Sequence, residues 1–100
     1  MKIQDLYQSR RNWTQEANAR DDSGDRVADI ESPHACSWCL AAAVAKCYGT
    51  GVRSKEIFDK IREYIAERYP MERTKGVLTW NDNAMRRFED VQGLVVALDI

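Results

Sequence analysis

The sequence predicts a small, mainly helical α+β fold in which about four helices surround a central buried helix. Apolar residues recur at helical spacing in three long segments, and the run CLAAAVA (39–45) would be apolar on every side of a helix. A glycine-containing turn between two short arms adds one β-hairpin. A chain of 100 residues is close to the common size of one domain, so we expect residues 1–100 to form a single domain.

The N-terminal segment predicts a short amphipathic helix over residues 3–13. Its apolar residues Ile3, Leu6 and Tyr7 stand at near-helical spacing, and Trp13 continues the pattern. Two arginines stand toward the end of this segment, where positive charge complements the helix dipole.

The stretch DDSGD (21–25) is typical of a turn, because glycine adopts positive φ and Asp or Ser side chains bond to the nearby backbone. The arms Asn18–Arg20 and Arg26–Ala28 would complete the hairpin. Three aspartates in five residues also raise the possibility of a calcium site. The spacing differs from that of an EF-hand loop, and the ligands after the glycine are missing. We therefore interpret the stretch as a plain turn.

A central helix is predicted from Pro33 to about Tyr48. Ser32 is a preferred N-cap residue, and proline suits the first helical position. Gly49 or Gly51 would end the helix. Because this helix is apolar on most sides, we expect it to be the buried hub of the fold.

Two more helices are predicted, over Ser54–Tyr69 and from about Arg86 to Leu98. The apolar stripe of the first is Ile57, Phe58, Ile61, Ile65 and Tyr69, and that of the second is Phe88, Val91, Leu94, Val95 and Leu98. Gly93 costs about 1 kcal/mol relative to alanine inside a helix, which indicates a close helix contact. Between the helices, VLTW (77–80) is predicted to be extended and NDN (81–83) to be a capping loop.

The only histidine and all three cysteines stand in one segment, as His34, Cys36, Cys39 and Cys47. A zinc ion would need four converging ligands. On the predicted helix Cys47 lies roughly 16 Å from Cys36, too far to share an ion. We interpret the cysteines as packing residues and expect neither metal nor cofactor.

A thiol catalyst is the alternative interpretation of this segment. Cys36 would lie in the first helical turn, where the dipole lowers a thiol pKa, and His34 is two residues away. Side chains two residues apart on a helix point to different sides. We therefore expect no catalytic residues and no enzyme, and keep a small thiol- or metal-dependent enzyme built on His34 and Cys36 as the alternative.

The charges nearly cancel, with 15 basic and 16 acidic residues and a net charge of −1. Nucleic-acid binders usually carry a strong positive excess, so we expect no direct nucleic-acid binding. A DNA-binding regulator that uses the Ser54–Tyr69 helix is the less favoured alternative. No apolar run is long enough for a membrane span or a secretion signal, and an odd cysteine number is untypical of a disulfide framework. We expect a cytoplasmic protein without membrane partners.

The stretch Trp80-Asn81-Asp82-Asn83 is interpreted in two ways. Asn and Asp side chains can cap the last helix, or the stretch can be a recognition loop with Trp80 as its aromatic anchor. Trp and Arg are enriched at binding hot spots, and two further arginines stand near Trp13. The predicted partner-binding residues are Arg10, Arg11, Trp80, Asn81, Asp82, Asn83, Arg86 and Arg87.

Three short motifs span most of the chain. They are Trp13 followed by Ala19-Arg20-Asp21, then Trp38-Cys39-Leu40-Ala41-Ala42, and finally Trp80-Asn81-Asp82. In this layout the chain resembles a family of small, uncharacterised bacterial and phage proteins. It departs from the pattern at Ala41-Ala42, where we expect Gly-Ala, and at Asn83-Ala84-Met85, where we expect a Pro-Gly turn.

The resemblance implies no known activity. The occurrence of such proteins in phages and mobile elements implies a counter-defence role, and anti-CRISPR inhibitors are commonly of this size and mostly bind without catalysis. We therefore expect a non-enzymatic inhibitor that docks on a host protein or nucleoprotein complex in the bacterial cytoplasm.

Overall fold

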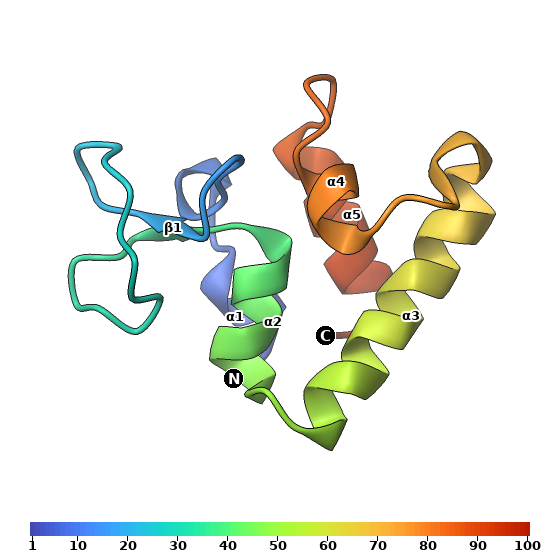
Figure 1. Ribbon diagram of the computed structural model, residues 1–100, viewed down its shortest axis with the longest axis horizontal. Coiled ribbons are helices and arrows are strands. Elements are labelled where there is room, and N and C mark those ends of the chain that lie inside the picture. Colours follow the sequence, from blue (N-terminus) through green and yellow to red (C-terminus); the bar gives the residue numbers. More distant parts are fainter.

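Figure 1 shows the computed structural model, which describes residues 1–100. The elements are α1 (Ile3–Leu6), the 3₁₀-helix η1 (Arg10–Asn12), β1 (Ala19–Arg20), β2 (Ser37–Trp38), α2 (Leu40–Tyr48), α3 (Val52–Arg68), the 3₁₀-helix η2 (Pro70–Glu72), α4 (Val77–Asn81) and α5 (Phe88–Ala97). The predicted class, mainly helical α+β with one small antiparallel strand pair, is confirmed.

The core is one cluster of 19 buried residues to which all five α-helices contribute. α2 contacts α1, α3 and α4, and its Leu40, Ala43 and Val44 are fully buried. The expectation that this helix lies buried at the centre of the fold is therefore confirmed. Its expected beginning at Pro33 is wrong, because α2 begins only at Leu40.

The Ser-Pro step forms a turn instead of a helix start. Ser32 accepts hydrogen bonds from His34 N to its Oγ (3.2 Å) and from Ala35 N to its carbonyl oxygen (3.1 Å). The chain then extends to form β2, and Cys39 becomes the N-cap of α2, with its Sγ accepting from Ala42 N at 3.4 Å. Strand pairing at residues 37–38 thus overrides the local helix signal.

β1 and β2 pair antiparallel, with Ala19 opposite Trp38 and Arg20 opposite Ser37. The expected second arm, 26–28, is wrong as a strand, since it contributes only a single bridge from Arg26 to Arg20. The turn before it is confirmed. Gly24 has φ +86°, and the Oδ1 of Asp21 accepts hydrogen bonds from Ser23 N and Asp25 N.

The expected helix over 3–13 is wrong in its length, because α1 ends at Leu6. Ser9 then caps the separate turn η1, with its Oγ accepting from Arg11 N at 3.3 Å. After this turn Trp13 is extended and forms a parallel bridge with Trp38.

α3 and α5 follow their predicted stripes. Ile57, Ile61 and Ile65 are buried on α3, and α5 buries Phe88, Val91, Leu94 and Val95. Gly49, with φ +77°, ends α2 as predicted, and α3 ends just before Pro70. The expected close contact at Gly93 is wrong, because this residue is exposed and a Cβ there would meet nothing within 4 Å.

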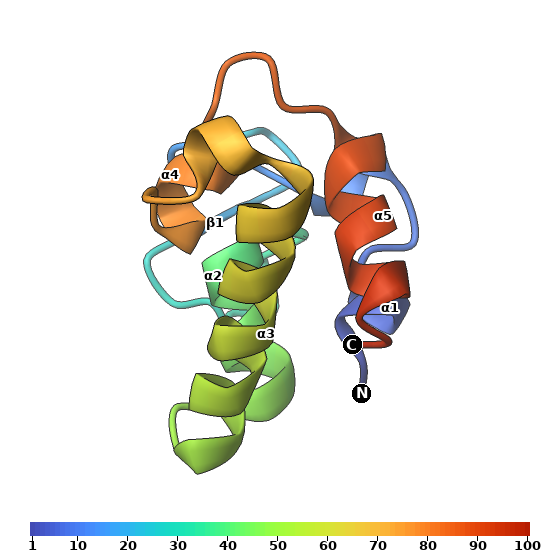
Figure 2. The ribbon, with the colours of Figure 1, turned by 90° about the vertical axis from the view of Figure 1, so that its right-hand side faces the viewer.

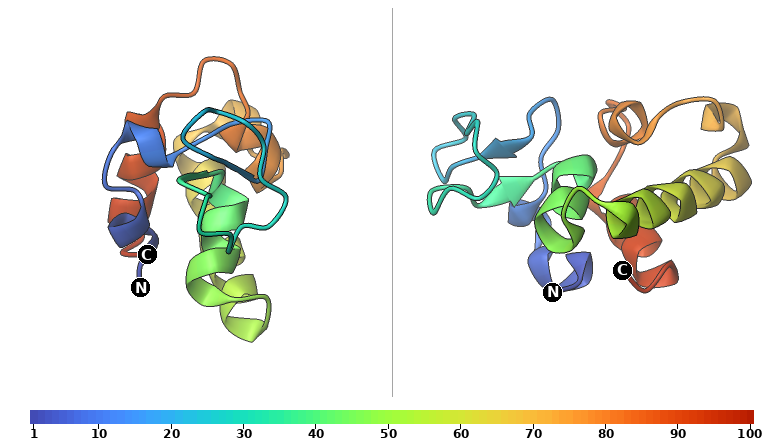
Figure 3. Two further views of the ribbon diagram at one scale, coloured as in Figure 1. Left: turned by 90° about the vertical axis from the view of Figure 1, so that its left-hand side faces the viewer. Right: turned by 60° about the horizontal axis from the view of Figure 1, so that its bottom comes forward.

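The two ends of the chain lie together, where α1 packs beside α5 (Figure 2). Ile3 N donates to the Ile100 carbonyl oxygen, and Lys2 pairs with Asp99 at 2.6 Å. The largely irregular segment 13–38 forms a lobe at one end of the molecule, and α3 extends toward the other (Figure 3). No helix combines the length and the apolarity that a bilayer crossing requires.

Candidate docking surface

The predicted recognition loop begins with Trp80, which the structure places inside the core. α4 buries Val77, Trp80 and Asn81 on one side, so the stretch 77–80 is helical and its predicted extended form is wrong. The Trp80 ring is fully buried and packs edge-on against Tyr69, with the ring centroids 5.3 Å apart. Because its side chain has no exposed surface, Trp80 cannot be the expected anchor, and its role is corrected to core packing.

Asn81 is also fully buried, and its side chain joins three segments. Its Oδ1 accepts hydrogen bonds from Trp13 Nε1 (2.7 Å) and Leu40 N (3.1 Å). Its Nδ2 donates to the Thr14 carbonyl oxygen (3.1 Å) and to Asp82 Oδ1 (2.9 Å). All four hydrogen bonds that an amide side chain can make are present. The expected contact role of Asn81 is therefore corrected to a structural one.

Asp82 and Gln15 extend this network to the surface. The Oδ1 of Asp82 accepts from Glu16 N (3.0 Å), and Gln15 Nε2 donates to the carbonyl oxygens of Asn81 and Asn83, both at 2.8 Å. Glu16 has φ +61°, a conformation that is uncommon outside glycine. The bond to Asp82 holds this loop in place.

Arg86 forms a buried ion pair with Glu72, with Nη2 2.5 Å from Oε1. Its Nε donates to the Trp80 carbonyl oxygen (2.9 Å), and its guanidinium carbon lies 4.1 Å from the centroid of the Trp80 ring. Asn83 Nδ2 also donates to Glu72 Oε1 (3.2 Å). Arg86 therefore ties η2 to the connection between α4 and α5, and its expected contact role is corrected to this structural one.

The ion pair changes the titration of Glu72. Burial by itself would raise the pKa of Glu72, but the hydrogen bonds from Arg86 and Asn83 and the charge of Arg86 outweigh burial. The net result is a pKa below the ordinary glutamate value, so Glu72 stays ionised in the folded protein at neutral pH.

The other predicted contact residues are wholly or partly exposed, and their role stays a prediction. Arg10 and Arg11 are exposed on η1. Arg87 caps α5, with its Nη2 3.6 Å from Asp90 Oδ1. The partly buried Asp82 and Asn83 come together with Arg86 around α4. Arg10 lines a small open pocket with Gln15 and Glu16, which bond to Asn83 and Asp82.

We use the name methionine face for five residues of α4 and its two flanking connectors, Met71, Lys75, Leu78, Thr79 and Met85. The exposed fractions of Met71, Leu78 and Met85 are 93%, 51% and 84%. Lys75, Leu78 and Thr79 line an open groove of about 490 Å³ beside α4.

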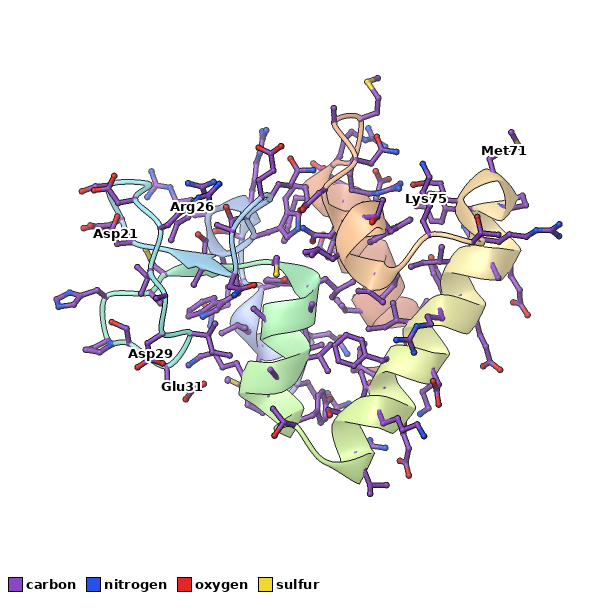
Figure 4. All side chains as sticks on the ribbon, in the orientation of Figure 1. Asp21, Arg26, Asp29, Glu31, Met71 and Lys75 are labelled. Atoms are coloured by element: carbon purple, nitrogen blue, oxygen red, sulfur yellow. The ribbon has the colours of Figure 1, made fainter.

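The flanks of the methionine face are held by the polar network. Met85 N donates to Asn83 Oδ1 at 2.9 Å, and Met71 precedes Glu72, which accepts from Asn83 Nδ2. Met71 and Lys75 lie at the same end of the molecule (Figure 4). Leu78 and Asp82 also line a second open groove of about 490 Å³, together with residues 16–19 and 26–28.

Sequence reasoning missed the methionine face, although a signal for it exists. Met71 and Met85 stand alone in the polar connectors MERTKG and NDNAMRR, outside every predicted apolar stripe. A long apolar side chain in such a connector has no stripe through which to join the core. Leu78 left no such signal, because its exposure follows only from the helical form of α4.

The model of a family of unknown function, DUF6197, matches residues 4–97. The chain belongs to this family. The comparison with curated proteins and the comparison with solved structures found no match. Membership of a family without a known activity is thus confirmed, and the DUF6197 match says nothing of CRISPR inhibition.

In this DUF6197 member the three motifs of the sequence converge on the Asn81 network. Trp13 and Asn81 bond directly, and Ala19 pairs with Trp38 across the sheet. The Arg20 Nε donates to Thr14 Oγ1 at 2.9 Å, next to the carbonyl oxygen that Asn81 bonds. The motifs therefore describe how this chain folds, and the five residues of the methionine face lie outside them.

The three thiols of this DUF6197 member and its one imidazole differ in exposure. His34 is exposed, Cys39 is buried, and Cys36 and Cys47 are half-buried. No three side chains of the His, Cys, Asp and Glu types come together in a way that could hold a metal ion. The expectation that the sulfurs are packing material is confirmed fully only for Cys39.

The thiol pKa values point away from an activated nucleophile. Burial raises the pKa of Cys36, Cys39 and Cys47 above the ordinary cysteine value. For Cys36 the carboxylates of Asp22 and Asp21 raise it further. A catalytic thiol needs the opposite shift, because the thiolate is the nucleophile.

Proposed function

We propose that this protein is a non-enzymatic protein-binding module and that the methionine face is its contact surface. The observation that carries the proposal is the concentration of exposed apolar side chains. Six large apolar residues are exposed in the whole chain, and three of them, Met71, Leu78 and Met85, lie within fifteen residues around α4. Clustered apolar exposure is typical of a docking site, whereas single exposed apolar residues are ordinary.

The methionine face suits docking because its frame is rigid and its side chains are adaptable. The Glu72, Asn83 and Arg86 bonds fix the two connectors that carry the methionines. Methionine side chains are flexible and polarisable, so they adjust to the shape of a partner. Burying one such side chain fully contributes about 1.5–3 kcal/mol.

The rim of the methionine face is polar. Asp82 and Asn83 line the groove beside Leu78, and Lys75 adds a positive charge without an ion-pair partner. A polar rim around an apolar centre is the usual anatomy of a protein interface. In this proposal Asp82 and Asn83 keep the contact role that the sequence suggested, and Leu78 replaces Trp80 as the anchor.

The finer form of the proposal is an inhibitor from a phage or mobile element that docks on a host protein or nucleoprotein complex, in the manner of an anti-CRISPR protein. The resemblance to bacterial and phage proteins supports it. Asp21 and Asp29 lie on the lobe opposite Met71 and Lys75, where they would form a second contact, with a basic nucleic-acid groove of the complex (Figure 4). Glu31 lies on the same lobe and pairs with Lys46. Three free cysteines favour the reducing cytoplasm of a bacterial host.

Affinity capture from host lysate tests the contact surface. Leu78→Glu and Met85→Glu place a charge in the methionine face, and Val52→Glu and Val96→Glu are matched controls at exposed apolar residues elsewhere. We expect the first pair to lose a specific partner that the wild type and the controls retain. Retention of every specific partner by all four variants contradicts the proposal.

A plaque assay tests the finer form. We expect expression of the protein to raise plaque formation by a phage that the host CRISPR system targets, and Leu78→Glu to abolish the rise. Unchanged plaque formation with the wild type removes the anti-CRISPR form and leaves the binding module in place.

Nothing in the geometry favours the DNA-binding alternative. α3 carries five basic and four acidic residues, and Arg53 and Arg62 are already paired with Glu56 and Asp59. A nearly neutral helix cannot supply the phosphate contacts that dominate DNA affinity.

A further inference from the structure

An open polar pocket of about 660 Å³ lies between η1, the 21–24 turn and β2. Its volume is within the range of small-molecule sites in proteins. Its lining residues are Ser9, Arg11, Asn12, Trp13, Thr14, Arg20, Asp21, Asp22, Gly24, Cys36 and Ser37. No residue of the methionine face lines this pocket, so its role is independent of the proposed docking function.

The Ser37 side chain is a polar group in the wall of the pocket. Ser37 is only 7% exposed, and its hydroxyl has no partner in the chain but is reached by solvent, because the only fully buried side-chain donor without a partner is Trp80 Nε1. The neighbouring Thr14 hydroxyl accepts from Arg20 Nε, and its own proton has no acceptor in the chain. Both hydroxyl groups are therefore available to a polar ligand in the pocket.

The pocket carries one free charge of each sign. Arg11 of η1 and Asp22 of the turn both line it, and neither forms an ion pair or a side-chain hydrogen bond. Arg20 differs, because its guanidinium already donates to Thr14 Oγ1, the Gly24 carbonyl oxygen and the Gln15 carbonyl oxygen. Arg20 therefore holds the wall, and Arg11 and Asp22 are free to meet a ligand.

The walls of the pocket are fixed by hydrogen bonds from separate segments. Asn12 Nδ2 donates to the Cys36 carbonyl oxygen (3.1 Å), which joins η1 to the residue before β2. The Oδ1 of Asp21 accepts from Ser23 N (2.9 Å), which orders the turn that carries Asp22. A pocket whose walls are already ordered loses little entropy when it binds.

We propose that this pocket binds a small zwitterion, a free α-amino acid. Its carboxylate pairs with the Arg11 guanidinium, its ammonium group pairs with the Asp22 carboxylate, and the Ser37 hydroxyl bonds to a further polar atom. Trp13 supplies an aromatic wall for the side chain of the ligand. A ligand with one charge only would leave one of the two charged groups without a partner.

Amide NMR spectra of the ¹⁵N-labelled protein test this site. The probes are the standard L-amino acids, each at about 10 mM, since weak zwitterion binding corresponds to a Kd near 1 mM. We expect saturable shifts at Gly24 and Ser37 with at least one amino acid. The N-acetyl form and the amide form of that amino acid, which each lack one charge, should bind about tenfold more weakly.

Matched variants locate the binding. Arg11→Ala and Asp22→Asn should weaken binding about tenfold, since each removes one charge-assisted contact. Arg10→Ala and Asp25→Asn change neighbouring residues outside the pocket lining and should leave binding unchanged. A bound amino acid should also slow alkylation of Cys36 and leave that of Cys47 unchanged.

The proposal is overturned if no amino acid shifts Gly24 or Ser37. It is also overturned if the blocked forms bind as well as the free amino acid, or if Arg11→Ala and Asp22→Asn bind like the wild type. None of these outcomes bears on the methionine face, because no residue of that face is tested.

Discussion

Asn81 joins distant segments through one buried side chain. Its side-chain amide forms hydrogen bonds with the N-terminal segment at Trp13 and Thr14, with Leu40 at the beginning of α2, and with the adjacent Asp82. Each bond replaces one that the group would make with water, so its net contribution is modest, whereas loss of the amide leaves several buried partners unsatisfied. The asymmetry makes this residue a sensitive point of the fold.

We expect Asn81→Ala to lower the free energy of unfolding by about 3 kcal/mol, because Trp13 Nε1, Leu40 N and the Thr14 carbonyl oxygen lose their partner. Urea unfolding measures the change. Asn18→Ala is the control, since Asn18 is exposed, and it should stay within about 0.5 kcal/mol of the wild type. Equal midpoints for both variants contradict the network.

The raised thiol pKa values predict slow alkylation at neutral pH. Cys39 should react only as fast as the protein unfolds, because it is buried, and half-buried Cys36 and Cys47 should react before it. Iodoacetamide labelling followed by peptide mass spectrometry gives the three rates. Fast labelling of Cys36 below pH 7 would contradict this and restore the thiol-catalyst hypothesis.

Two glycines on different helices have opposite roles. Gly93 lies inside α5 and is exposed, with open space at its Cβ position. Gly49 ends α2 at φ +77°, where any other residue is strained.

We expect Gly93→Ala to raise the free energy of unfolding by about 0.5–1 kcal/mol, because alanine favours the helix. Gly49→Ala should lower it by about 1 kcal/mol, because the left-handed conformation is costly for alanine. Thermal unfolding monitored by circular dichroism compares the two. A stabilised Gly49→Ala variant would contradict the assigned end of α2.

The link between η2 and the α4–α5 connection depends on pH. The pKa of Glu72 is lower in the folded than in the unfolded chain, so the ion pair adds full stability above the unfolded value of about 4.3. The contribution is lost as the pH falls through the folded pKa.

Glu72→Gln should therefore lower the free energy of unfolding by about 2 kcal/mol at pH 7, because a buried charge-assisted bond is lost. The gap to the wild type should shrink as the pH falls below about 4.3. Glu56→Gln removes the exposed pair with Arg53 and should cost less than about 0.5 kcal/mol. Urea unfolding at several pH values measures these free energies. If the difference between the wild type and Glu72→Gln does not vary with pH, titration of Glu72 does not contribute to stability as proposed.

The sequence predicted those elements whose signal is local and long. The stripes of α3 and α5 recur over successive turns, and Gly49 and Pro70 end helices by backbone geometry alone. The beginning of α2 was missed because pairing of Ser37 with Arg20, a tertiary contact, decides it. α4 was missed because a four-residue apolar run fits both a strand and a helix.

The roles of the predicted recognition residues also depend on tertiary contacts. Trp80 and Arg86 are residue types that favour interfaces, yet they are equally suited to a core that contains a buried ion pair. Only the partner, Glu72, distinguishes the two roles, and it stands in a connector fourteen residues away. The sequence pattern at residues 80–83 was recognised, but the burial of Trp80 and Asn81 depends on tertiary contacts that no local pattern encodes.

At the scale of the whole molecule, all three tryptophans belong to one packed unit. Trp38 and Trp80 are in the core cluster, and Trp13 packs against it. The lobe formed by residues 13–38 is attached to the helices through the Asn81 network, so we expect it to unfold with them.

We therefore predict one urea transition with coincident tryptophan fluorescence and circular dichroism, and an m value of about 1 kcal/mol/M. A single transition would support residues 1–100 as one domain. An earlier fluorescence change with intact helices would show that the 13–38 lobe is a separate unit.

The shared location of the two chain ends has a practical consequence. Both ends emerge on the side of the molecule away from the α4–α5 connection (Figures 1 and 2). Tethering the protein to a bead or a sensor chip by either end would leave the α4–α5 connection, which contains Met85, away from the support. If an immobilised variant of the methionine face loses a partner, the loss would therefore reflect the substitution and not steric blockage by the support.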